Sequence, residues 1–139
     1  MNTYYAQVQR DGDAWLVTFP DVPEAITGGA NEDEALANAV DALEVALLTH
    51  VLDGLAVPEA MAQSGVAVYV SAAVAVKIGF IEAFRASGLT RVEVARRLGK
   101  QEGEVRRMLD PYHNTKVQAL EAGLRTLGKR LVVSVRDAA

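Results

Sequence analysis

The sequence contains no cysteine and only two histidines. The absence of cysteine excludes a disulfide framework and a thiolate zinc site. His113 has no obvious acidic or thiol partner for nucleophilic chemistry, and His50 is expected near a helix end, where a cation suits the helix dipole. We therefore expect no catalytic residue, no metal and no cofactor, and we expect that the protein is not an enzyme.

Long apolar runs are also missing. Charged residues or glycine interrupt each apolar stretch before the ~18 residues that a bilayer-spanning helix needs, so no membrane span is expected. The first residues, MNTYYAQVQRDGD, lack the basic segment and apolar run of a signal peptide. With no cysteine to place in an oxidising compartment, these features fit a cytoplasmic protein.

Basic residues are nearly absent from the first half. Residues 1–70 contain eleven Asp and Glu but only one basic residue, Arg10, which gives a net charge of −10. Residues 71–139 contain thirteen Lys and Arg against seven Asp and Glu, a net charge of +6, and the two halves sum to −4. A basic segment suits phosphates, whereas an acidic one suits a basic protein or no partner.

Half of the residues are hydrophobic, which is enough for packed cores. Alternating or compact apolar segments predict four strands, at residues 3–10, 15–19, 25–27 and 66–70. Asn31 is the expected N-cap of a helix that runs to about Leu52, and Glu34 occupies the capping-box position. The first half is therefore predicted to have the order β-β-β-α-β.

Helical patterns dominate the second half. We predict helices from Ser71 to Gly88 and over residues 91–98, 102–109 and 115–127, followed by a strand at Leu131–Val135 that could pair with its own copy across a two-fold axis. The fold class is α+β, with one domain at residues 1–71 and a second, all-α domain at residues 72–139. Each is small enough for its stability to be marginal, so we expect a homo-oligomer, either a dimer or a tetramer.

The segment 89–109 predicts a helix-turn-helix. Thr90 and Glu93 form a capping box, and Gly99 supplies the left-handed turn after the first helix. Ala95 lies where the two helices approach closely, and Val105 anchors the second helix. Sterics determine several of these positions together, so the pattern is more specific than a basic face on an ordinary helical bundle.

The second helix of such a motif enters the major groove of DNA. Candidates to face the bases are Lys100, Gln101, Glu102, Glu104 and Arg106, and candidate phosphate contacts are Arg91, Arg97, Arg107 and Lys116. We predict modest affinity for each monomer, because acidic residues dilute the charge of the helix.

The first half resembles HicB-type antitoxins. The resemblance rests on Tyr4-Tyr5, the Asp11-Gly12-Asp13 turn, the run from Trp15 through Phe19-Pro20-Asp21-Val22-Pro23 to Ala25, Thr27-Gly28-Gly29, and the helix with Glu34-Ala35 and Ala42-Leu43. The second half resembles the Cro/repressor-like helix-turn-helix that is fused to part of that family. Residues 113–116 and 127–131 match the same subgroup.

The resemblance implies a partial RNase H-like fold that binds and masks a small basic toxin of the HicA type, which cleaves mRNA. It also implies that the helix-turn-helix binds operator DNA and represses the operon of the pair. The candidate toxin contacts are Tyr5, Trp15, Phe19, Asp21, Val22 and Glu24. The aromatic members of this set could instead belong to the core.

Two other functions remain open. The first is a ligand-sensing transcriptional repressor with no toxin partner, and the neighbouring reading frame would distinguish it. The second is a divergent RNase H-like nuclease, which is weakly supported. Its candidate carboxylates, Asp11, Asp13, Asp21 and Glu24, lie in turns and loops rather than converging from rigid elements.

Overall fold

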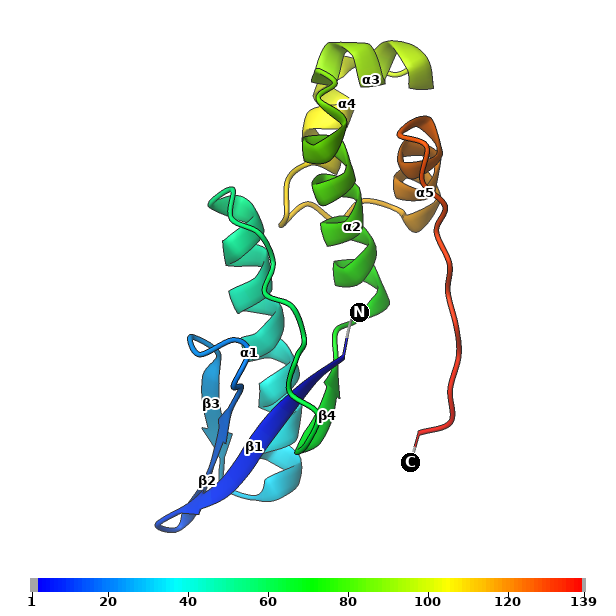
Figure 1. Ribbon diagram of the computed structural model, residues 1–139. Helices are drawn as coiled ribbons and strands as arrows, with labels where there is room; N and C mark the ends of the chain where they lie inside the picture. The colour runs from blue at the N-terminus through cyan, green and yellow to red at the C-terminus, as the bar shows by residue number, and fades with distance from the viewer. Residues whose placement is uncertain (1–2, 139) are drawn as a thin grey trace. The chain divides into compact units, whose positions relative to one another are not determined.

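The computed structural model describes residues 3–138 and divides into two compact units, with the boundary between Ala75 and Val76 (Figure 1). This boundary lies inside the helix α2 (Ala72–Ser87), a few residues after the one predicted from the sequence. The structure is a mixed α+β fold. In the described residues it has one four-stranded antiparallel sheet and five helices.

The first unit has the predicted order β-β-β-α-β. Its elements are β1 (Thr3–Asp11), β2 (Ala14–Thr18), β3 (Ile26–Gly29), α1 (Glu32–Leu52) and β4 (Val66–Tyr69). The strand order in the sheet is β3-β2-β1-β4, so β3 and β4 are its edges. As predicted, Asn31 caps α1, and its side-chain oxygen accepts a hydrogen bond from the backbone N–H of Glu34 at 2.8 Å.

Strand register explains which side of the sheet is buried. Val8 pairs with Val17 and Tyr4 with Val68, so these residues share one face, and Tyr4, Val17 and Val68 are buried. The apolar stripe of α1 packs on that side, where Ala35, Ala39, Leu43, Leu47 and Val51 are buried. The neighbouring residues of each strand point to the opposite face, as a period of two requires.

By length and composition alone, α1 is also apolar enough to cross a bilayer. A core helix of this size gives the same signal, and seven residues of α1 are buried. Its role as the helix that covers the sheet accounts for its apolar character.

The second unit contains the rest of α2 and three further helices, which are α3 (Arg91–Leu98), α4 (Glu102–Met108) and α5 (Val117–Thr126). The bounds predicted for α3 are confirmed, and those for α4 and α5 are correct to within two residues. Val94, Ala95 and Val105 form a buried cluster, against which Phe84, Leu89, Leu98, Leu109 and Leu127 pack.

One glycine allows a close approach in this unit. A Cβ atom added to Gly123 in α5 would lie 2.5 Å from Cε1 of Phe80 and 3.0 Å from Cε of Met108. Both neighbours are themselves buried, so neither has free space to move into. Gly123 thus lets α5 pack directly on the side chains of α2 and α4.

The strand predicted at Leu131–Val135 is not formed. Residues 129–138 adopt no regular secondary structure, and Val135 is 95% exposed (Figure 1). A strand requires a neighbour to accept and donate its backbone hydrogen bonds, and no described part of this single chain supplies one. The alternation of apolar residues was therefore insufficient to make a strand within one copy.

We expect Gly123→Ala to lower the free energy of unfolding by about 1–3 kcal/mol, because the added methyl group overpacks a filled core. Gly79→Ala is the matched control. Gly79 lies inside α2, and an added Cβ there meets no atom within 4 Å. The free energy of unfolding of this control should rise by up to about 1 kcal/mol, because alanine has a higher helix propensity than glycine. Urea denaturation followed by far-UV circular dichroism would measure both, and equal stability of Gly123→Ala and wild type would contradict the close approach.

Candidate functional site

The segment α3–turn–α4 contains the N-cap and the left-handed glycine that its sequence predicts. Thr90 caps α3, and its Oγ1 accepts a hydrogen bond from the N–H of Glu93 at 3.2 Å. Gly99 ends α3 in the left-handed conformation, with φ of 66°. Residues that carry a Cβ atom rarely adopt this backbone conformation. Lys100 and Gln101 then connect Gly99 to the start of α4.

The structure leaves every predicted DNA-contacting side chain at least partly accessible. The exposed or half-buried residues are Arg91, Arg97, Lys100, Gln101, Glu102, Glu104, Arg106, Arg107 and Lys116. The apolar residues of the same helices point inward, since Val94 and Val105 are fully buried. The two helices therefore separate an apolar inner side from a charged outer side.

Ion pairs link the charged side chains of this surface. Nε of Arg91 lies 3.0 Å from Oε1 of Glu102, which ties the start of α3 to the start of α4. Within α4, Glu102 also lies 3.9 Å from Arg106. Nζ of Lys100 lies 3.5 Å from Oε2 of Glu104. Two glutamates thus partly neutralise three of the cations that the sequence assigned to DNA.

Glu93 organises a second set of charges on α3. Its carboxylate accepts hydrogen bonds from Arg96 at 2.6 Å and from Arg97 at 3.0 Å. These bonds lower the pKa of Glu93 to about 2, Arg96 contributing more than Arg97. Glu93 is therefore ionised near neutral pH and holds the guanidinium of Arg97 on the surface of α3.

A buried cation supports the end of α4. Lys77 in α2 is only 4% exposed, and its Nζ donates to the carbonyl oxygens of Met108 at 3.0 Å and Arg107 at 3.3 Å, and to Oγ1 of Thr115 at 2.8 Å. Burial lowers the pKa of Lys77, and the charge of Asp110 opposes that shift. The last carbonyls of a helix lack partners within the helix, so Lys77 satisfies two of them and fixes where α4 ends. The sequence pattern alone did not predict this buried cation.

The predicted toxin contacts of the first unit divide into buried and accessible residues. Phe19 and Val22 are buried in the core, which corrects their assignment as side chains offered to a partner. Tyr5 and Trp15 are half-buried, and the guanidinium of Arg10 lies 5.3 Å from the centre of the Trp15 ring. Phe19 continues the alternation that buries Val17, whereas Val22 lies in the loop between β2 and β3, where strand alternation predicts nothing about burial.

The two acidic candidates have distinct surroundings. Oδ2 of Asp21 accepts hydrogen bonds from the backbone N–H groups of Met61 and Ala62, both at 2.8 Å, so it holds the long connection before β4. The carboxylate of Glu24 contacts Nε2 of His50 in the last turn of α1. A backbone hydrogen bond and the bond to His50 lower the pKa of Glu24. Glu24 remains exposed and ionised, whereas Asp21 has a structural role.

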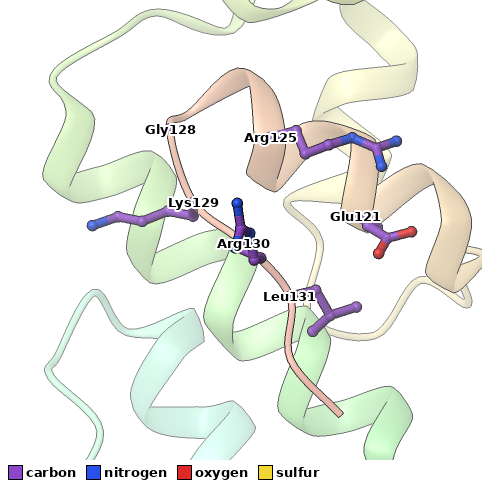
Figure 2. Close-up of a pocket in the computed structure, with 6 residues that line it drawn as sticks. All are labelled: Glu121, Arg125, Gly128, Lys129, Arg130 and Leu131. Carbon is purple, nitrogen blue, oxygen red and sulfur yellow. The ribbon is translucent and has the colours of Figure 1, made fainter.

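A shallow pocket in the second unit lies where α5 ends. It is lined by Glu121, Arg125, Gly128, Lys129, Arg130 and Leu131. Figure 2 shows the side chains of Arg125 and Lys129 pointing in different directions, so the cations do not converge on one point. Within residues 3–138, no three His, Asp or Glu side chains gather as metal ligands would.

Comparison with known proteins assigns the family. A family model described as HicB_like antitoxin of bacterial toxin-antitoxin system matches residues 3–79. Antitoxin HicB 2 of Photorhabdus laumondii is 34% identical over 128 residues, which cover 92% of each chain. Antitoxin HicB of Pseudomonas fluorescens is 34% identical over 142 residues, which cover 99% of this chain and 97% of that protein. Antitoxin HicB of Escherichia coli K12 is 34% identical over 119 residues, which cover 84% and 86%.

We expect Lys77→Met to destabilise the second unit by about 1–3 kcal/mol, because buried oxygen acceptors lose their donor. Lys129→Met is the control, since Lys129 is exposed, and it should change stability by no more than about 0.5 kcal/mol. Thermal unfolding of the two variants beside wild type would measure the difference. If Lys77→Met were as stable as Lys129→Met, the cap on α4 would not contribute to stability.

Proposed function

The chain belongs to the HicB-like antitoxin family, and from this premise we propose that it neutralises a small, basic, mRNA-cleaving toxin of the HicA type and represses its own operon by binding operator DNA. The observation that carries the proposal is the family match together with relatives named as antitoxins, whose likeness extends over both units. The location that fits these activities is the cytoplasm.

The first unit is the toxin-binding part of this proposal. Its β-β-β-α-β order fits the partial RNase H-like fold that the family resemblance implies. Residues 1–70 carry a net charge of −10, and opposite charge accelerates the encounter of two proteins, an effect that salt weakens. Exposed ion pairs contribute little affinity each, so lasting binding requires apolar contact as well. Occlusion of the toxin's active site would then prevent mRNA cleavage.

The second unit is the DNA-binding part. In a helix-turn-helix, the N-terminal residues of the second helix contact base edges while flanking cations contact phosphates. The capped α3, the Gly99 turn and the exposed charges of α4 support this role. The side chains of Gln101 and Arg106 suit adenine and guanine respectively.

A homodimer completes the DNA-binding proposal. A short recognition helix reads only a few base pairs, and a two-fold dimer doubles the contact on a palindromic operator. The apolar segment Leu131–Val135 has no partner strand among the described residues of its own copy, and a second copy can supply one in an antiparallel pair. Tetramers would follow from further contacts between such dimers.

Residues 1–75, expressed alone, should bind the toxin encoded beside this gene and rescue growth of cells that produce it. The expectation follows from the compact first unit and its acidity. Co-purification from cells and growth on inducing medium are the measurements, with residues 76–139 as the control that should not rescue. A folded fragment 1–75 that fails to bind the toxin would refute this division of labour.

Charge changes in α4 should alter operator binding in opposite directions. Arg106→Ala should weaken binding by about 1–3 kcal/mol and relax specificity at one base pair. Glu102→Gln should strengthen binding, because Arg91 and Arg106 lose the carboxylate that pairs with them. Glu121→Gln, which removes one negative charge from α5 instead, is the control for net charge. Gel-shift titrations of the operon's promoter at fixed salt would decide, and tighter binding by both glutamine variants would indicate a non-specific charge effect.

A further inference from the structure

A groove in the first unit runs between the edge strand β3 and the helix α1. Ile26 and Val45 both line it, and they are 61% and 58% exposed, so two large apolar side chains are accessible at one site. Ala42 and Ala46, one helical turn apart, line it between them. Because alanine side chains are short, the space between the strand and the helix is left open at these positions.

The groove favours side-chain docking over the addition of a strand. A free sheet edge can pair with a strand from another chain, and β3 is such an edge. Here, however, Nδ2 of Asn38 donates to the carbonyl oxygen of Gly28 at 2.9 Å, so a side chain of α1 already occupies the middle of that edge. The accessible features are therefore the apolar side chains.

All charged residues that line the groove are acidic. They are Glu24 and Asp41, and no lysine or arginine is among the described lining residues. His50 contacts Glu24 and holds its carboxylate in place. Arg10, the only lysine or arginine in residues 1–70, lies over Trp15. The groove thus combines an apolar centre with a negative rim, the arrangement of a protein interface that selects basic partners.

The open face of the sheet is a weaker candidate. It presents Tyr5, Leu16 and Tyr69, but strand register places Gln7 opposite Thr18 between them. The paired residues between its aromatic and apolar side chains are thus polar and uncharged.

We propose that the groove between β3 and α1 is the docking site of the basic toxin, which places an apolar side chain between Ile26 and Val45 and cations beside Glu24 and Asp41. The inference rests on the proposed antitoxin function and adds the surface that performs it. Buried apolar anchors at the centre of an interface carry most of its affinity, whereas rim charges accelerate association.

The test uses the full-length chain and the purified toxin encoded beside its gene, with binding followed by biolayer interferometry. Val45→Lys should weaken binding at least tenfold, since it places a cation where the toxin docks. Tyr69→Lys is the matched control, because Tyr69 is 53% exposed in the same unit and the substitution adds the same charge. It should change affinity less than twofold. Asp41→Lys should slow association at low salt, and the slowing should diminish at high salt.

The outcomes separate the two levels of the proposal. If the wild-type chain does not bind the toxin, the antitoxin function itself is overturned. If it binds and Val45→Lys and Asp41→Lys bind equally well, or if Tyr69→Lys is the more damaging change, only the groove assignment is overturned. Far-UV circular dichroism and operator binding verify folding. Should Val45→Lys lose its helical signal, Asp41→Lys decides, because Asp41 is an exposed charged residue whose substitution leaves the core intact.

Discussion

Each unit of this chain forms its core from about seventy residues. That constraint decides which apolar side chains are buried and which remain exposed. In the first unit, a single helix covers one face of a small sheet, so the side chains of the apolar stripe of α1 are buried against that sheet. In the second, short helices meet around Val94, Ala95 and Val105. A small core has little apolar surface to spare. Among the large apolar side chains that remain exposed, Ile26 and Val45 line one groove of the first unit, which makes them candidates for contact with another molecule.

Local features of the sequence were read correctly because short-range physics decides them. Asn31 and Thr90 cap their helices through hydrogen bonds to residues three positions later, and Gly99 adopts the left-handed turn at the position where the pattern required it. The bounds of α3 followed from these signals. The order of strands and helices in the first unit followed from the change between periods of two and about 3.6.

Features that depend on distant segments were missed or misassigned. Val22 was predicted to contact a partner and Phe19 to lie either at a partner or in the core, and both are buried. Lys77 was not singled out from the sequence, because its acceptors come from α4 and the loop that follows, thirty or more residues away. A strand at Leu131–Val135 needs a neighbour, and residues 3–138 of one copy supply none. One feature of the sequence pointed to the groove beside α1. Val45 is apolar but lies outside the buried stripe of its helix.

The ion pairs of α4 bear on the protein concentration at which the proposed repression would set in. Glu102 shares its carboxylate between Arg91 and Arg106, so in the proposed operator complex DNA phosphates and bases would compete with a group that the protein already carries. In a chain that represses its own operon, weaker binding raises the protein concentration at which transcription stops. Glu102 would then help to set that concentration, so that synthesis continues until the antitoxin exceeds the toxin.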